Sequence, residues 1–149
     1  MAVKPIPEGY HSITPYLIVR GADETIEFLK KAFGAQVVFD PLRRPDGKIL
    51  HSEVKIGDSR VMLTEHTDQH KPQPAMLYLY VADVDAQYQR ALSAGGQSIK
   101  EPVDQFFGDR TASVRDPAGN HWELGTHKED VSPEELKRRV AAMFKQKAA

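Results

Sequence analysis

An internal repeat constrains the fold of this 149-residue chain more than any other feature of the sequence. Shifting the sequence by 62 positions aligns six identical residues that lie within residues 16–34 of the first half. The aligned pairs are Tyr16 with Tyr78, Leu17 with Leu79, Val19 with Val81, Asp23 with Asp85, Ala32 with Ala94, and Gly34 with Gly96. Because sequence repeats correspond to repeated structural units, the two halves are predicted to fold alike.

Each half shows the same order of secondary-structure signals. A strand rich in β-branched and aromatic residues, at 12–20 and again at 75–82, precedes apolar residues at helical spacing. Three short strand candidates follow each helix, at 36–41, 49–56 and 60–66 and at 97–102, 109–115 and 120–126. The predicted fold class is α+β, with two tandem βαβββ modules that form a curved mixed sheet around a cleft. Within a single domain of residues 1–149, module 1 spans about 12–66, a linker 67–74, and module 2 about 75–127.

The region 132–146 is predicted to form an additional C-terminal helix. Ser132 is a favourable N-cap, Pro133 suits the first helical position, and Glu135 completes a capping-box pattern. The apolar stripe of this helix consists of Leu136, Val140, Met143 and Phe144. Two interpretations remain open: the stripe covers the body of the domain, or it docks on a partner subunit.

Composition narrows the classes of function. Lys and Arg number 20 and Asp and Glu number 21, so the charge pattern favours neither a nucleic-acid partner nor an anionic membrane. Cysteine is absent, which excludes disulfides, thiolate nucleophiles and iron–sulfur clusters. Neither a signal-peptide pattern nor a run of about 18 apolar residues occurs. We therefore expect a soluble, cytoplasmic protein that has no membrane partner.

Strand alternation divides the side chains of each sheet between a core face and an open face. Apolar residues at alternate positions, such as Val54, Leu63 and Trp122, belong to the core face. The open face then receives Thr14, Tyr16, His51, Glu53, Met62, Met76, Tyr78, His121 and Glu123. If the two sheets curve together, these side chains line a hollow suited to a small molecule, because such sites combine apolar walls with a few polar groups. The alternative is a solvent-exposed sheet face without a function.

Four segments of the chain carry the motifs that suggest a family. They are Pro15-Tyr-Leu-Ile-Val-Arg-Gly, Glu27-Phe-Leu-Lys-Lys-Ala-Phe-Gly-Ala, His51-Ser-Glu-Val-Lys-Ile-Gly-Asp-Ser-Arg-Val-Met-Leu and Arg115-Asp-Pro-Ala-Gly-Asn-His-Trp-Glu-Leu-Gly-Thr-His. Together with the duplicated βαβββ unit, they resemble the vicinal oxygen chelate superfamily, which includes glyoxalase I, ring-cleaving dioxygenases and bleomycin-resistance proteins. Within this superfamily the chain is most similar to the PhnB-type glyoxalase-like branch, and the tail at 126–135 also looks typical of that branch.

The resemblance implies where a divalent metal would bind. Enzymes of the superfamily hold the ion through His, Glu or Gln on the first and last strands of each module, and those positions are Thr14, Met62, Met76 and Glu123. Only Glu123 is a suitable ligand, because a hydroxyl and two thioethers are poor partners for hard or borderline divalent ions. The inherited metal centre is therefore expected to be missing. An alternative set, Glu123 with His51 and His121, would suit Zn, Ni, Fe or Mn, unless the adjacent His and Glu simply form hydrogen-bonded pairs.

The resemblance and the residues together lead to two hypotheses on function. The first is a small-molecule binding protein in which Tyr16, Tyr78 and Phe107 stack on the ligand and His51, Arg110, His121 and Glu123 supply polar contacts. The second is a metal-dependent lyase, isomerase or dioxygenase in which Glu123 is a metal ligand or a catalytic base. Phe106 and Phe107 fit an aromatic lip or the core equally well. A homodimer is expected, because related proteins commonly pair two chains.

Overall fold

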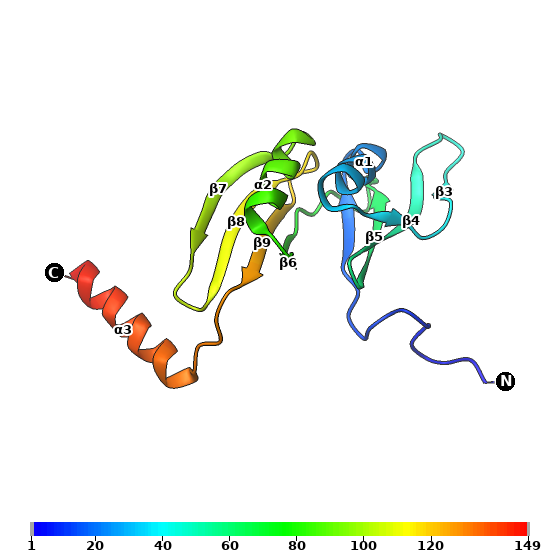
Figure 1. The fold of residues 1–149 in the computed structure, drawn as a ribbon. Coiled ribbons are helices and arrows are strands. Elements are labelled where there is room, and N and C mark those ends of the chain that lie inside the picture. Colours follow the sequence, from blue (N-terminus) through cyan, green and yellow to red (C-terminus); the bar gives the residue numbers. More distant parts are fainter. Residues whose placement is uncertain (1, 149) are drawn as a thin grey trace.

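Residues 2–148 are described by the computed structural model, which contains two βαβββ modules followed by a C-terminal helix (Figure 1). Module 1 consists of β1 (Tyr16–Val19), α1 (Ala22–Phe33), β2 (Gln36–Val37), β3 (Leu42–Arg43), β4 (Ile49–Ile56) and β5 (Ser59–Glu65). Module 2 consists of β6 (Met76–Tyr80), α2 (Val84–Ser93), β7 (Gln97–Asp104), β8 (Asp109–Arg115) and β9 (His121–His127), and α3 (Pro133–Ala148) follows. The predicted α+β class and the duplicated unit are confirmed.

The two modules have the same sheet topology. The strand order is β1-β5-β4-β2 in the first sheet, with β3 also paired to β4, and β6-β9-β8-β7 in the second. In each sheet the first strand runs parallel to the last strand of its module, and the remaining pairs are antiparallel. Between the sheets, β1 and the segment before β6 share one isolated bridge, Ile18 with Gln73. We call the boundary between β1 and β6 the seam.

One predicted strand of module 1 is wrong beyond its first residues. Only Gln36 and Val37 of the predicted strand 36–41 pair with β4 as β2. Pro41 has no N–H to donate to a ladder, and the chain turns away before it returns as β3. β3 then pairs with the other end of β4, with Leu42 opposite His51.

Each of the first two helices begins beside the last strand of its own module. In module 1, the carboxylate of Glu65 accepts hydrogen bonds from Gly21 N at 2.9 Å and Ala22 N at 2.7 Å. In module 2, Thr126 Oγ1 accepts from Val84 N at 2.9 Å. Because the first N–H groups of a helix have no partner within the helix, these two side chains satisfy them and connect the end of each βαβββ unit to its helix.

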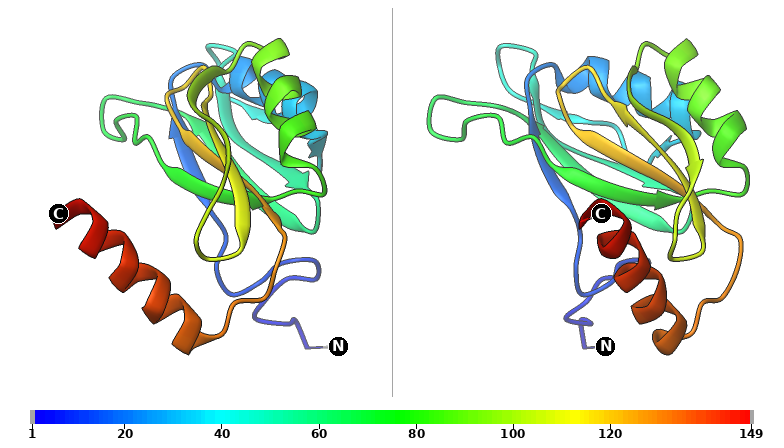
Figure 2. Two further views of the ribbon diagram at one scale, coloured as in Figure 1. Left: turned by 60° about the vertical axis from the view of Figure 1, so that its left-hand side comes forward. Right: turned by 90° about the vertical axis from the view of Figure 1, so that its left-hand side faces the viewer.

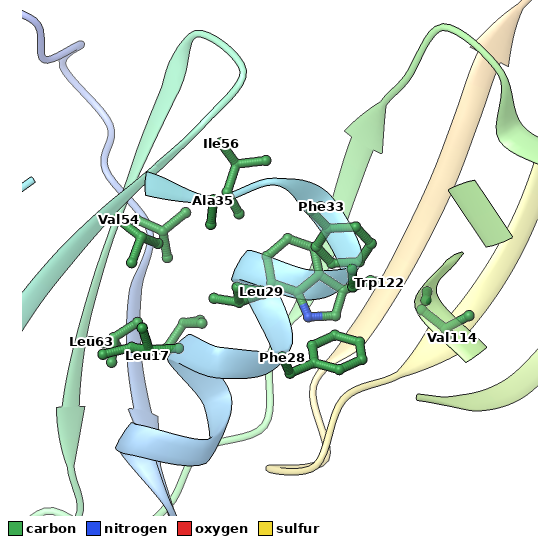
Figure 3. Packing of buried hydrophobic residues seen from close by; sticks show 14 of the residues in the cluster. Leu17, Phe28, Leu29, Phe33, Ala35, Val54, Ile56, Leu63, Val114 and Trp122 are labelled. Atoms are coloured by element: carbon green, nitrogen blue, oxygen red, sulfur yellow. The ribbon is translucent and has the colours of Figure 1, made fainter. Parts of the chain in front are cut away.

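Helices α1 and α2 lie side by side on the same side of the two sheets (Figure 2). The predicted core residues of β4, β5 and β9 are buried beneath them. Figure 3 shows Phe28 and Phe33 of α1 beside Trp122 of β9, and the ring centroids of Phe33 and Trp122 are 5.0 Å apart. The apolar core therefore joins the two modules on the helix side of the seam.

The C-terminal helix α3 projects away from the two modules instead of covering them (Figures 1 and 2). Its N-cap is as predicted, since Ser132 Oγ accepts from Glu135 N at 3.2 Å. The Glu135 carboxylate, however, binds Arg138 and Arg139 and so does not complete the capping box. Arg139 also reaches the rest of the chain through Phe106 O at 2.8 Å. The interpretation that α3 covers the body of the domain is therefore wrong. In the described residues 2–148, no helix is long and apolar enough to cross a membrane.

Candidate functional site

The sheet face opposite α1 and α2 carries most of the predicted site residues, and we call it the open face. In module 1 the register places Met62 between Tyr16 on β1 and Glu53 on β4. In module 2 it places Glu123 between Tyr78 on β6 and Ser113 on β8, and His121 beside Met76. Each module thus presents one row that consists of an aromatic residue, a central residue and a polar residue.

On module 1 the open-face side chains form a hydrogen-bonded chain that ends under the N-terminal segment. Tyr16 Oη lies 3.4 Å from His51 Nδ1, and His51 Nε2 lies 3.2 Å from Glu53 Oε1. Tyr10, which precedes the repeat, donates its hydroxyl to the other oxygen of Glu53. The hydrogen bond to Glu53 raises the pKa of the Tyr10 phenol, so the phenol remains a donor. Glu53 is only 5% exposed and is therefore poorly accessible to a ligand.

On module 2 the corresponding row remains more accessible. Ser113 donates a short hydrogen bond to Glu123 Oε2, and His121 Nε2 lies 3.0 Å from the same oxygen. The side chain of Met76 is 66% exposed beside His121. Glu123 Oε1 has no hydrogen-bond partner among the described residues. This group can accept a hydrogen bond or a proton from a molecule bound on the open face.

A second polar group on module 2 surrounds Asp109. Tyr78 Oη and Tyr80 Oη donate to Asp109 Oδ2 at 2.7 and 2.9 Å. His127 Nδ1 lies 2.7 Å from Asp109 Oδ1, and its other ring nitrogen lies 2.8 Å from Asp130. Three donors thus converge on a carboxylate that is 3% exposed.

The Asp109 group changes the ionisation of its members. Burial opposes ionisation of Asp109, but hydrogen bonds from His127, Tyr78 and Tyr80 outweigh it and hold the pKa of this carboxyl below its usual value. Burial and the hydrogen bond to Asp109 raise the pKa of Tyr78. The hydrogen bonds to Asp109 and Asp130 raise the pKa of His127. The group therefore favours ionised Asp109 beside two neutral phenols and a protonated imidazole.

Gly125 allows Tyr78 to reach Asp109. The Tyr78 ring lies across β9, and a Cβ atom at Gly125 would be 2.7 Å from both Cε1 and Oη of that ring. Atoms of side chains do not approach so closely without displacement. Because Gly125 has no side chain, the phenol of Tyr78 on β6 can cross β9 and bind the carboxylate of Asp109 on β8.

Two predicted ligand contacts lie outside the open face. Arg110 lies on the same side of β8 as the buried Ala112, and it binds Asp85 of α2 at 2.8 and 3.0 Å and Asp104 at 3.2 Å. Arg110 is therefore not part of the open-face rows, and its contact with a ligand stays a prediction. Phe107 lies in the turn between β7 and β8, where its ring packs edge-on against Phe106 at 5.3 Å between centroids. Both rings are half-buried, so Phe107 is neither core nor a member of the open-face rows.

Residues from both modules meet in a hollow of about 350 Å³ at the seam. Three of the predicted residues line it, namely Tyr16, Met76 and Tyr78. Pro15, Leu17, Ala75 and Leu77 complete the lining. This seam hollow is apolar and lies next to the row that contains Glu123, because Tyr78 is paired directly with Glu123.

The residues at the four inherited metal positions do not fit a divalent ion. Thr14, Met62, Met76 and Glu123 offer one carboxylate, one hydroxyl and two thioethers. The alternative set is not assembled either, since β5, β1 and β6 lie between His51 on β4 and His121 on β9. Within residues 2–148 no three His, Asp or Glu side chains are grouped as metal ligands would be.

Sequence reasoning missed Tyr10, Ser113 and Asp109. For Ser113 and Asp109 a signal was present, because alternation along the predicted strand 109–115 places both on the face opposite Ala112 and Val114. For Tyr10 there was none. It lies in a Pro- and Gly-containing segment outside the repeat, where no periodicity relates it to Glu53.

Comparison with known proteins gives a family and a fold. Residues 9–124 match the sequence model of the Glyoxalase/Bleomycin resistance protein/Dioxygenase superfamily. The uncharacterized protein Mb0911c of Mycobacterium bovis is 36% identical over 142 residues, which cover 88% of this chain and 93% of that protein. The crystal structure of TioX from Micromonospora sp. ML1 is similar with a TM-score of 0.62 and 23% identity, over 82% of this chain and 100% of TioX. A PhnB protein from Bacillus cereus gives a TM-score of 0.63 at 17% identity, over 78% and 99% of the two chains.

Proposed function

Because the chain belongs to the glyoxalase/bleomycin resistance protein/dioxygenase superfamily, we propose that it is a small-molecule binding protein that works without the metal centre of the superfamily's enzymes. The observation that carries this proposal is the set of side chains at the four inherited metal positions. Of Thr14, Met62, Met76 and Glu123, only Glu123 is a good ligand for a divalent ion. Retention of the fold with loss of the ligand set favours binding over metal-assisted catalysis.

The seam hollow and the Glu123 row supply the two parts that a small-molecule site needs. Tyr16, Met76 and Tyr78 form apolar walls whose side chains are 50%, 66% and 43% exposed. The partly buried carboxylate of Glu123 and the imidazole of His121 stand beside these walls. Apolar walls of this kind contribute affinity, and a few fixed polar groups orient the ligand. The proposed ligand is therefore a compact, partly apolar molecule with a hydrogen-bond donor directed at Glu123.

A thermal-shift screen of a metabolite and antibiotic library, run with EDTA and separately with Zn²⁺, Ni²⁺, Fe²⁺ or Mn²⁺, tests the proposal. A ligand that binds only the folded state raises its apparent stability. We expect at least one compound to raise the midpoint equally with EDTA and with metal. Isothermal titration of that compound should show about ten-fold weaker binding to Glu123→Gln, because a hydrogen bond to a charged acceptor is lost.

The matched control is Glu53→Gln, which changes the module 1 carboxylate that Tyr10 covers. This variant should bind the compound as the unchanged protein does. Metal analysis of the purified protein provides the opposing outcome. One tightly bound ion per chain that disappears in Glu123→Ala would contradict the proposal.

That opposing outcome would support the second candidate, a metal-dependent lyase, isomerase or dioxygenase. The observation that favours it is the close contact of Glu123 with His121 and Ser113. A carboxylate held in this way is positioned as a general base would be. Turnover of a compound found in the screen, lost in Glu123→Gln, would identify this activity.

We also propose that the protein is a homodimer. The α3 stripe, which includes Leu136, Val140 and Met143, lies on a helix that leaves the body of its own chain, and the open face exposes Met76 and Tyr80. One chain thus provides both an apolar helix face and an apolar sheet face, which two copies can pair by two-fold symmetry. Sedimentation velocity at micromolar concentration should show a dimer that Val140→Glu dissociates and Lys137→Glu, on the exposed side of α3, does not. A monomer at that concentration would contradict the proposal.

Membership of the PhnB-type branch and a cytoplasmic location are further parts of the proposal. The tail at 126–135, which looks typical of that branch, supports the first. A cysteine count of zero, which suits a reducing compartment, supports the second. The nearly balanced charge of the chain, at −1, supports the expectation that nucleic acids are not partners. Cell fractionation with an antibody against the chain tests the location.

A further inference from the structure

A cavity of about 160 Å³ lies at the seam beside the seam hollow. Its apolar wall is formed by side chains of both modules, with Ile56 and Val61 on one side and Leu77, Leu79 and Trp122 on the other. Leu77 and Leu79 pack against the core but are only partly buried. The strand edges of β1 and β6 do not form a ladder along this stretch, so the wall remains unfilled.

Arg60 lines this cavity with a guanidinium that is only partly hydrogen-bonded. Its guanidinium lies against the Tyr10 ring, 4.6 Å from the ring centroid, and Nη1 is 3.5 Å from Tyr10 Oη. Its Nε atom is buried without a hydrogen-bond partner. No carboxylate in the described part of the chain forms an ion pair with Arg60, whereas Arg43 and Arg110 each bind an aspartate.

An arginine in this state is suited to bind an anion. A guanidinium stays charged at every physiological pH, and a buried N–H without a partner costs free energy. A ligand carboxylate can accept from Nε and one Nη nitrogen together, which is the strongest geometry available to arginine. The Tyr10 ring already holds the guanidinium of Arg60 in place. The side chain therefore loses little conformational entropy when a ligand binds.

We propose that the cavity is a binding site for a small aromatic or branched aliphatic monocarboxylate, with the apolar group against Trp122 and the carboxylate on Arg60. An apolar cavity of about 150 Å³ accommodates a molecule of the size of benzene, so a phenyl group fits the volume. His121, Glu123 and Ser113 do not line the cavity, although Pro15, Leu77 and Tyr78 border both it and the seam hollow. The site is therefore distinct from the Glu123 row and stands whether or not that row binds a ligand.

Trp122 is the only tryptophan of the chain, so its fluorescence reports directly on the cavity wall. We would titrate the 149-residue protein with benzoate, phenylacetate and 3-methylbutanoate, and with benzamide and phenylacetamide as uncharged counterparts. At least one carboxylate should change the Trp122 emission saturably and raise the thermal midpoint. Its amide should bind about ten-fold or more weakly, because the charge-assisted pair is lost.

Three variants assign the effect to the cavity. Arg60→Gln should weaken carboxylate binding about ten-fold or more, and Leu77→Phe should abolish it by filling the space. The matched control is Lys55→Gln, which removes the cation directly opposite Arg60 in the ladder without lining the cavity, and its binding should be unchanged.

The result that overturns the proposal is no saturable change with any carboxylate, or equal affinity for acid and amide. Equal affinity of Arg60→Gln and the unchanged protein would overturn it as well. If circular dichroism shows that Arg60→Gln does not fold, the comparison of each acid with its amide and the Leu77→Phe variant still test the proposal. Glu123→Gln should leave this binding intact, so failure here and failure of the proposed function are separate outcomes.

Discussion

In module 1 the carboxylate of the open-face row is Glu53 on β4, whereas in module 2 the carboxylate of the row is Glu123 on β9, the last strand of its module. Glu53 is paired with Met62, the central residue of the module 1 row. In module 2 the carboxylate is itself the central residue, because Glu123 is paired with Ser113 at the end of the row. Glu53 lies under Tyr10 of the N-terminal segment, and Glu123 remains partly exposed. The two modules therefore share their strand order but differ in the polar side chains on their open faces.

The difference between the modules is largest at the turn before the last strand. In module 2, Asp116 accepts four hydrogen bonds at 2.9 Å, from Ala118 N, Asn120 N, Asn120 Nδ2 and Trp122 Nε1. In module 1, Asp58 of the corresponding turn accepts one hydrogen bond from Ser59 and is exposed. The turn of module 2 is thus part of the core, and the turn of module 1 is a surface connection.

We expect the largest loss of stability from Asp116→Ala. This substitution leaves the buried Trp122 Nε1 and Asn120 Nδ2 without acceptors, which should lower the free energy of unfolding by roughly 3–5 kcal/mol. The matched change Asp58→Ala should cost less than about 0.5 kcal/mol, as exposed substitutions usually do. Urea unfolding followed by circular dichroism measures both. Equal losses at the two turns would break the comparison.

Substitutions at the starts of α1 and α2 should lower the free energy of unfolding less than Asp116→Ala does, and by unequal amounts. Glu65→Ala removes a buried carboxylate from two N–H groups at the start of α1, for an expected loss of about 2–3 kcal/mol. Thr126→Val removes the neutral acceptor of Val84 N at the start of α2 and the hydrogen bond that Thr126 Oγ1 donates to Val81 O, for an expected loss of about 1–2 kcal/mol. Urea unfolding of both variants provides the measurement. A larger loss in Thr126→Val would show that the charge of Glu65 adds nothing.

Most of the fold follows from the sequence because strand period and repeat are strong constraints. Burial on one face forces alternation, so Val54, Leu63 and Trp122 had to lie toward the helices. The same alternation along β8 places Arg110 on the helix side with Ala112. Contact of Arg110 with a ligand was inferred because a guanidinium suits carboxylates. That chemical property carries no information on which face of a strand the side chain occupies, so the contact stays a prediction.

Other features were beyond sequence reasoning for physical reasons. An amphipathic stripe predicts that α3 buries Leu136 and Val140, but it does not say against which surface. The contact of Tyr10 with Glu53 joins residues 43 positions apart through an irregular segment. The converging bonds on Asp109 depend on the absence of a side chain at Gly125, which only the strand register reveals.

Gly125→Ala tests that dependence. The added methyl group should displace the Tyr78 ring and lower the free energy of unfolding by about 1 kcal/mol, since the partly exposed ring can swing outward. In a Tyr78→Ala background the same substitution should cost almost nothing, because the contact is gone. A double-mutant cycle by urea unfolding gives the coupling between the two sites. Equal costs in both backgrounds would mean that Tyr78 does not lie over Gly125.

The smallest predicted effect concerns the pH dependence of the Asp109 group. The pKa of His127 is raised by Asp109 and Asp130, so its contribution to stability is fully present below about pH 6.5, the unfolded value. This contribution is lost as the pH rises through the pKa of the folded state. Asp109 has a lowered pKa, so its contribution is present above about pH 4 and is lost as the pH falls through its folded pKa. Both contributions coexist between these limits.

His127→Gln should therefore reduce the free energy of unfolding more at pH 5.5 than at pH 8.5. His66→Gln provides the baseline from module 1, because His66 follows β5 as His127 ends β9 and lies 3.9 Å from Glu65 rather than between two aspartates. Urea unfolding at the two pH values gives the difference, and an NMR titration of the imidazole should show the pKa of His127 falling in Asp130→Asn. If His127→Gln loses the same amount at both pH values, the imidazolium does not stabilise the group, and the polar difference between the two modules reduces to the phenols of Tyr78 and Tyr80.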